Sequence, residues 1–286
     1  MPRKVGGIHF RRIAFHDNSN LAASGAAAPL ARKRSLMNIE YHKFYSKNLG
    51  REMEFKVYGD GGKPVLCVPC QSGRFYEFED MRMLDVYAPY IESGKIQVFT
   101  IDTIDSQTLA AEGDPRARIE LHERWIKYIV EEAVPAFLKI NGSSLDSGTR
   151  FVVTGLSLGA LHAATLYFRF PDVFDAVMSL SGLYSNEFYF KDYHDDLTYI
   201  NSPQQFIKGM PANHPYIGKY RSGKIIICVG QGAWENETLE STKYFKTVLE
   251  EKNIGAWVDI WGHDVNHDWD WWYVQAAYFL PKLLEI

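Results

Sequence analysis

Residues 154–160, which read Thr-Gly-Leu-Ser-Leu-Gly-Ala, constrain the fold more than any other part of this chain. They follow an apolar, β-branched run at 151–153 and open an alanine-rich segment at 160–169 that favours a helix. In a strand–turn–helix context, the pattern Gly-x-Ser-x-Gly is typical of a nucleophile elbow, a sharp turn that exposes the serine hydroxyl. Glycine is needed on both sides because a Cβ there would collide with the neighbouring strand or helix. The pattern predicts that Ser157 is a nucleophile and that the N–H of Leu158 points at a developing oxyanion.

Strand-like and helix-like segments alternate along the rest of the chain. Several strand candidates are continuous apolar runs, which is the pattern of strands covered on both faces. The alternation predicts a mostly parallel central sheet with helices on both faces, the α/β class. A length of 286 residues fits one such domain. The expected strands are 53–58, 65–68, 97–101, 151–154, 176–180, 224–229 and 256–261, and the expected helices are 119–138, 158–168, 238–251 and 271–284.

Two segments depart from this alternation. Residues 1–36 carry seven Lys or Arg and one acidic residue. We interpret 1–36 as a basic, disordered extension, or as a start codon assigned too early, rather than as a targeting segment, and we expect one α/β domain at 37–286. The second segment, at about 184–220, is rich in aromatic and acidic residues and has no long periodic run. We expect this excursion to form a lid or a pocket wall.

The composition excludes several kinds of partner. The net charge is −4 at pH 7 with no basic stripe, which argues against nucleic acid. No apolar run approaches the ~18 residues of a membrane span. The cysteines Cys67, Cys70 and Cys228 lie in or beside apolar strand-like runs, and buried free thiols fit a reducing compartment, so we expect a cytoplasmic protein. Cys67 and Cys70 form a Cys-x-x-Cys pair, but Cys67 lies within an expected strand, so a redox motif is not expected.

An activated serine needs a base and an orienting acid, and behind a nucleophile elbow these follow in the order acid, then histidine. Five histidines follow Ser157: His162, His194, His214, His263 and His267. We predict that His267 is the base, because it lies between the last expected strand and a final helix that Asp268 and Asp270 can start. His263 follows that strand too closely to reach the serine.

A metal site is a second interpretation of the same residues. His263 and His267 have the His-x-x-x-His spacing of a zinc-binding helix. Gly262 and Asn266 argue against a helix there, and only a helix places both imidazoles on one face. We therefore expect no metal and no other cofactor.

The acid is expected after the strand at 224–229. Glu235 and Glu237 are both candidates, and their spacing alone does not separate them. Glu237 also suits the first turn of the next helix, where a carboxylate offsets the helix dipole, so Glu235 is the better candidate. Glu187, after the preceding strand, is a further alternative. The second oxyanion donor is expected in the loop after the strand at 65–68, where we assign the backbone N–H of Gln71, with Ser72 as the alternative.

These motifs resemble the esterase D branch of the α/β-hydrolase superfamily over about residues 37–286. The resemblance rests on residues 155–160, on 230–235, which read Gly-Gln-Gly-Ala-Trp-Glu, and on 267–272, which read His-Asp-Trp-Asp-Trp-Trp. The second motif is similar to the family's Gln-Gly-x-x-Asp acid loop, which places Glu235 where an aspartate is usual. The third is similar to the family's histidine loop and favours His267.

The oxyanion loop departs from the family pattern. Where the family usually has His-Gly-x-Gly, this chain has Cys70-Gln71-Ser72-Gly73, so Gln71 replaces a glycine. The resemblance implies a serine carboxylesterase that hydrolyses small or short-acyl esters without a cofactor. An acyltransferase with the same triad and an inactive, hydrolase-like binding module remain as alternatives. A symmetric homodimer is expected only because it is the commonest assembly.

Overall fold

An eight-stranded sheet organises the chain, with the strands in the order β1-β2-β4-β3-β5-β6-β7-β8. In this computed structural model, the structure describes residues 37–284, so the expected extension at 1–36 lies outside the described residues. Strands β1 and β2 are antiparallel to their neighbours, and the pairs from β4 to β8 are parallel. The strands are β1 Ile39–Ser46, β2 Arg51–Tyr58, β3 Lys63–Val68, β4 Ile96–Ile101, β5 Phe151–Leu156, β6 Phe174–Leu180, β7 Lys224–Val229 and β8 Trp257–Ile260. The predicted α/β class with a mostly parallel sheet is confirmed.

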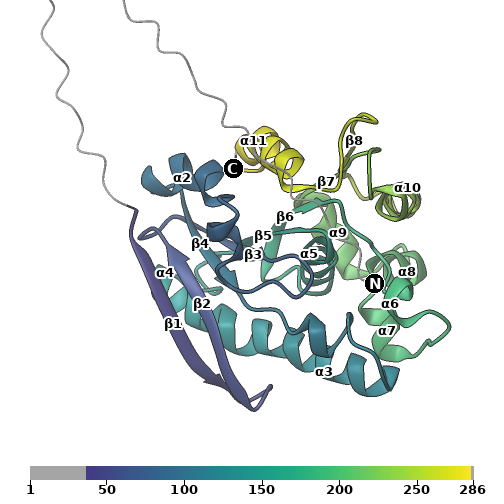
Figure 1. The fold of residues 1–286 in the computed structure, drawn as a ribbon, viewed down its shortest axis with the longest axis horizontal. Coiled ribbons are helices and arrows are strands. Elements are labelled where there is room, and N and C mark those ends of the chain that lie inside the picture. Colours follow the sequence, from purple (N-terminus) through teal and green to yellow (C-terminus); the bar gives the residue numbers. More distant parts are fainter. Residues whose placement is uncertain (1–36, 285–286) are drawn as a thin grey trace, which may run out of the picture. The chain divides into compact units, whose positions relative to one another are not determined.

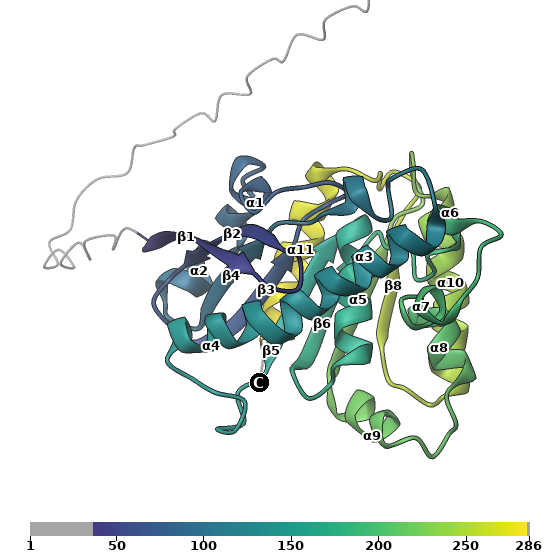
Figure 2. The same cartoon turned by 90° about the horizontal axis from the view of Figure 1, so that it is seen from below.

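Helices cover both faces of the sheet. Figure 1 shows α2 and α11 on one side of the central strands and α3 and α4 on the other. In Figure 2, α3 and α4 lie in line along their face, and α6, α7 and α8 gather near the far end of α3. The helices are α1 Glu77–Asp80, α2 Leu84–Glu92, α3 Pro115–Lys127, α4 Val134–Asn141, α5 Leu158–Arg169, α6 Glu187–Phe190, α7 Asp196–Ile200, α8 Pro203–Gly209, α9 Pro215–Ser222, α10 Asn236–Glu251 and α11 Trp269–Leu283, with a 3₁₀ turn η1 at Asp105–Gln107. None of the described helices is long and apolar enough to cross a membrane.

The alternation of side chains along the strands divides the core into two layers. In β3, Val65 and Cys67 pack with α2 and α11 on one face. Leu66 and Val68 pack with α3, α4, α5 and α10 on the other. Since successive side chains of a strand point to opposite faces, a strand buried on both sides is expected to be mainly apolar. All six residues of β4 and of β5 are buried, and most are apolar; the buried polar residues are Gln97 and Thr100 in β4 and Thr154 in β5.

The long helix expected at 119–138 is interrupted. Between α3 and α4, residues Tyr128–Ala133 form a π-helical segment, η2. Pro135 lies in the first turn of α4. Proline has no N–H to donate to the preceding turn and its ring crowds that turn, so a wider turn there is the local response.

Several elements were not expected from the sequence, among them β1, α1, α2 and the helices α6 to α9. Strand β1 lies at the edge of the sheet and is largely exposed, so it lacks the apolar run that marks several of the other strands. Helix α2 contains Pro89, which obscures a helical pattern. The excursion at 184–220 forms the four short helices α6 to α9, each of four to eight residues, which is too short for a visible periodicity.

Candidate active site

Ser157 lies in the sharp turn between β5 and α5. Its backbone is strained, with φ 57° and ψ −123°. A Cβ on Gly155 would lie 2.0 Å from the Gly159 carbonyl oxygen, and a Cβ on Gly159 would lie 2.3 Å from the Pro69 carbonyl oxygen. Both contacts are with backbone, which cannot move aside cheaply, so the turn requires glycine at both positions. The result is a serine that is only partly buried at the start of a helix.

His267 approaches Ser157 from the loop between β8 and α11. Its Nε2 lies 2.9 Å from the Ser157 Oγ. The backbone N–H of His267 donates to the carbonyl of Ala233 at 2.9 Å, and the imidazole packs against the Trp272 ring at 5.0 Å between ring centres. The histidine is therefore held by both the acid loop and the final helix, with 17% of its side chain exposed.

Glu235 lies behind the histidine, at the start of α10. Its Oε2 lies 3.1 Å from the His267 Nδ1, and its side chain is fully buried. Ser181 donates to the Oε1 at 2.5 Å, and Thr238 donates to the Oε2. Burial raises the pKa of the Glu235 carboxyl, but the hydrogen bonds from His267, Ser181 and Thr238 outweigh it and hold the pKa below its ordinary value. The buried acid is thus kept as a carboxylate.

The other residues considered from the sequence lie elsewhere. Glu237 is exposed in the first turn of α10, and Glu187 accepts a hydrogen bond from Gln205 at 2.6 Å. His263 is exposed, and His162 is buried against Asp105. Within residues 37–284, no group of three or more His, Cys, Asp or Glu side chains is arranged to hold a metal ion.

The loop that follows β3 runs beside the elbow, where the Pro69 carbonyl packs against Gly159. Three of its backbone N–H groups donate hydrogen bonds. The N–H of Cys70 donates to the Glu77 Oε2 at 2.7 Å, that of Ser72 to the Asp105 Oδ2 at 3.1 Å, and that of Gly73 to the Cys70 carbonyl at 2.9 Å. The N–H of Gln71 has no acceptor among the residues that the structure describes. Leu158 begins α5, where the first N–H groups of a helix have no partner within the helix.

Several side chains that support the site were not predicted. Trp272 donates from its Nε1 to the Ser181 Oγ at 2.9 Å, and Ser181 in turn donates to Glu235. Asp105 and Glu77 hold the loop after β3. Trp272 belongs to the aromatic motif that follows His267, so a signal was present for it. Asp105 is distant from that loop in sequence, Glu77 follows it closely, and neither carries a pattern of its own.

All three thiols are free. Cys67 and Cys228 are fully buried and Cys70 is half-buried. Burial raises the pKa of each thiol, and for Cys70 the nearby Glu77 carboxyl raises it further. The three thiols are therefore held in the protonated, unreactive form.

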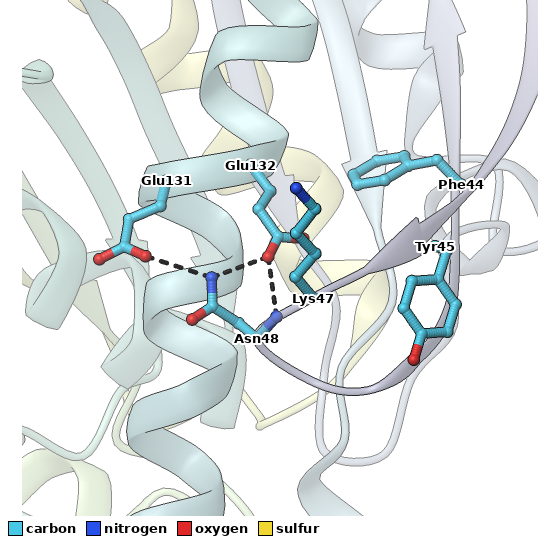
Figure 3. Close-up of a pocket in the computed structure, with 6 residues that line it drawn as sticks. All are labelled: Phe44, Tyr45, Lys47, Asn48, Glu131 and Glu132. Carbon is cyan, nitrogen blue, oxygen red and sulfur yellow. Dashed lines mark hydrogen bonds between the residues drawn. The ribbon is translucent and has the colours of Figure 1, made fainter.

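One cavity adjoins the predicted oxyanion loop and another lies apart from it. The first, of about 520 Å³, is lined by Gln71, by the loop that precedes α3 and by α6, including Phe188 and Tyr189. The second, shown in Figure 3, lies between the β1–β2 turn and η2, where Asn48 donates to Glu131 and Glu132. None of Ser157, His267 and Glu235 lines either cavity.

The sheet, the elbow and the serine–histidine–glutamate contact define the protein as an α/β hydrolase. The sequence model of the Esterase family, described as "Putative esterase", matches residues 46–283. This match covers most of the chain, and the chain therefore belongs to that family. The protein is accordingly a serine esterase, a carboxylic ester hydrolase, and the predicted resemblance to the esterase family is confirmed. A comparison with curated proteins finds no match.

Solved structures with the same fold include several esterases. A ferulic acid esterase aligns with a TM-score of 0.69 and 16% identity, over 87% of this chain and 98% of that one. An S-formylglutathione hydrolase from Agrobacterium tumefaciens aligns with a TM-score of 0.68 and 14% identity, over 87% and 95%. Another from Staphylococcus aureus aligns with a TM-score of 0.63 and 12% identity, over 90% and 100%. At these identities the likeness concerns the fold.

Proposed function

We propose that this esterase hydrolyses small or short-acyl esters through an acyl-enzyme on Ser157. In this proposal His267 is the general base and Glu235 is the acid that orients it. The observation that carries the proposal is one continuous chain of contacts, 2.9 Å from Ser157 Oγ to His267 Nε2 and 3.1 Å from His267 Nδ1 to Glu235 Oε2. A serine hydroxyl becomes a useful nucleophile only with such a base in hydrogen-bond reach.

The reaction has two halves. His267 removes the hydroxyl proton while Ser157 Oγ bonds to the ester carbonyl carbon, and the buried Glu235 carboxylate stabilises the imidazolium. The oxyanion accepts hydrogen bonds from the N–H groups of Gln71 and Leu158, each worth about 2.7–4 kcal/mol by analogy with other oxyanion donors. The intermediate then expels the alcohol, which takes the proton from His267. Water repeats the sequence on the acyl-enzyme, releases the carboxylic acid and frees Ser157, so no cofactor is required.

The cavity beside Gln71 supports a small substrate. Its volume of about 520 Å³ lies within the range of pockets for small molecules. Leu109 and Phe190, which line it, also pack in one cluster with Leu158, so the cavity adjoins the proposed oxyanion donors. Helix α6 of the excursion forms one wall, and the Tyr189 hydroxyl lies 3.5 Å from the Gln71 Oε1. We assign the substrate ester to this cavity.

The compartment and the assembly are further parts of the proposal. The free thiols of Cys67, Cys70 and Cys228 support a reducing compartment, and we propose the cytoplasm. A symmetric homodimer is proposed as the commonest assembly, and light scattering on the purified protein measures it.

The test combines covalent labelling with turnover. The parent protein and the variants Ser157→Ala, His267→Ala and Glu235→Ala are treated with a fluorophosphonate and measured by intact mass, beside hydrolysis of p-nitrophenyl acetate. We expect one label on the parent, none on Ser157→Ala, and a loss of turnover of at least ~10⁴-fold in Ser157→Ala and His267→Ala. A folded parent that neither labels nor hydrolyses esters would contradict the proposal and favour a binding module. Added alcohols that raise the rate of acyl transfer above that of hydrolysis would favour an acyltransferase.

A further inference from the structure

The loop after β3 holds its backbone in an unusual way. It contains Ser72 in the left-handed region, at φ 59°, where a residue other than glycine is strained by about 1–3 kcal/mol. Such a conformation persists only where its surroundings over-determine it. Gln71, the preceding residue, is the proposed oxyanion donor, so whatever fixes Ser72 also fixes the direction of the Gln71 N–H.

A buried carboxylate fixes Ser72 from one side. Asp105 lies in η1, directly after β4, and is 1% exposed. Its Oδ2 accepts the Ser72 N–H at 3.1 Å, and its Oδ1 lies 2.9 Å from the His162 Nε2. A buried carboxylate is costly unless both of its oxygens have partners, and here each has one.

His162 joins this carboxylate to the nucleophile helix. It lies on α5, the helix that begins with Leu158, and is 1% exposed. Its ring packs against Trp125 at 4.8 Å and against His122 at 5.2 Å between ring centres. The contact from Ser72 through Asp105 to His162 therefore ties the loop of one oxyanion donor to the helix of the other.

A second carboxylate fixes the loop on the other side of Gln71. Glu77, the first residue of α1, accepts the Cys70 N–H at 2.7 Å. A Cβ on Gly73 would lie 2.7 Å from the Glu77 Oε1, so the carboxylate is also packed against the loop backbone. The two carboxylates accept hydrogen bonds from the backbone N–H groups before and after Gln71, and the Gln71 N–H is left for a ligand.

We propose that Asp105, held by His162, and Glu77 are positioning residues that aim the Gln71 N–H at the oxyanion. They do this in a loop where a glutamine replaces the usual glycine. The inference rests on the proposed function, because it presumes that Gln71 donates to the oxyanion formed by attack of Ser157. Neither carboxylate contacts the reacting atoms, so each acts through the backbone that it holds.

The experiment compares an ester with its thionoester. Sulfur accepts hydrogen bonds more weakly than oxygen, so an intact oxyanion site favours p-nitrophenyl acetate over p-nitrophenyl thionoacetate. For Asp105→Ala we expect kcat, measured per site that fluorophosphonate titrates, to fall ~10–100-fold, with KM nearly unchanged. This is smaller than the ~10²–10³-fold effect of losing one oxyanion donor, because the N–H of Gln71 is misdirected and not removed. The oxo-to-thiono ratio of kcat/KM should fall by a similar factor. A structural defect alone lowers the number of titrated sites and leaves that ratio where it was.

Two variants sharpen the result. Asp105→Asn keeps an oxygen that can accept the Ser72 N–H, so it should recover most of the oxo-to-thiono ratio. Asp102→Ala is the matched control, because Asp102 is also a buried aspartate at the end of β4 but accepts from the Phe75 N–H at 2.9 Å and from Arg74 at 2.7 Å. It should lower stability without changing the ratio.

The outcomes separate this inference from the proposed function. An Asp105→Ala protein with the parental ratio and parental kcat per site overturns the positioning role, while Ser157-dependent turnover of the parent keeps the proposed function. A parent without Ser157-dependent turnover removes the proposed function itself. If Asp105→Ala does not fold, Glu77→Ala gives the same measurement from the other side of Gln71, and a parental ratio there overturns the inference as well.

Discussion

The elbow around Ser157 and the proposed oxyanion loop lie side by side, yet their backbones are held by different means. The elbow, around Ser157, is held by backbone packed on backbone, with Gly155 against Gly159 and Gly159 against Pro69. The proposed oxyanion loop, residues 70–73, is held by side chains from outside it, Glu77 and Asp105. Both arrangements stabilise a residue with positive φ, Ser157 in the elbow and Ser72 in the loop.

This difference decides which of the two regions can be recognised in a sequence. A close approach of two backbones requires glycine at fixed positions, so the elbow leaves a short local pattern. A loop held by carboxylates leaves no such pattern, because its supports come from η1, α1 and α5 and meet only in the folded chain. Substitutions in the two regions should therefore fail in different ways.

The largest effect is expected behind the elbow, where Glu235→Gln removes the charge that faces His267. By comparison with other triads, kcat should fall by ~10³–10⁴-fold, because an amide neither holds the tautomer that the base needs nor stabilises the imidazolium. The kcat of each variant for p-nitrophenyl acetate measures this. The matched control is Glu237→Gln, two residues along and exposed, which should lie within about twofold of the parent. A larger loss in Glu237→Gln than in Glu235→Gln would assign the acid to Glu237 instead.

A smaller but still large effect is expected from Gly159→Ala, which adds a Cβ that clashes with the backbone beside the elbow. The new Cβ would lie 2.3 Å from Pro69 O and 2.5 Å from Val68 O, so the end of β3 must shift. We expect a loss of about 2–4 kcal/mol in the free energy of unfolding and a fall of ~10²-fold or more in kcat/KM.

The control for this substitution is Gly218→Ala in α9. Nothing lies within 4 Å of the Cβ that it adds, and its φ is not positive. Alanine should stabilise that helix by about 0.5–1 kcal/mol and leave turnover unchanged. Denaturant midpoints and kcat/KM of both variants test the pair, and equal midpoints for the two would show that the elbow is not packed as described.

The same contrast separates what was predictable in this chain from what was not. The α/β class and seven strands could be predicted because several buried parallel strands are mainly apolar runs and β2 alternates apolar and polar residues, and the expected strand at 224–229 coincides with β7. The edge strand β1 was missed because it is largely exposed. The four short helices at 184–220 were missed because a helix of one or two turns shows no period.

The candidate site divides in the same way. The structure brings Ser157, His267 and Glu235 together. Each of the three lies next to a recognisable sequence signal: glycines, aromatic residues or the start of a helix. Ser181 and Asp105 could not have been found, because a lone serine or aspartate beside a strand has many possible roles. Only the three-dimensional contact, with Glu235 for the first and with Ser72 for the second, distinguishes them.

A moderate effect on stability is expected from the charge of Glu235. Because hydrogen bonds hold the pKa of Glu235 below its ordinary value of 4.5, the folded state binds its proton more weakly than the unfolded state. This stabilisation is fully present above about pH 4.5 and is lost as the pH falls through the lower, folded-state pKa. The gap in melting temperature between the parent and Glu235→Gln should therefore be largest near neutral pH and shrink on acidification. Thermal unfolding from pH 7 to pH 3 measures it, and a gap that widens in acid contradicts the assignment.

The smallest effect is expected at Cys70, which lies in the oxyanion loop next to Gln71. Burial and the Glu77 carboxyl both raise the pKa of its thiol, so almost no thiolate is present at pH 7.5. Iodoacetamide should leave the folded protein unlabelled and its turnover unchanged over an hour, while the unfolded protein should take three labels, one for each free thiol. Rapid labelling of Cys70 with loss of turnover would show that the loop opens to solvent. The two carboxylates would then hold it less firmly than glycine packing holds the elbow.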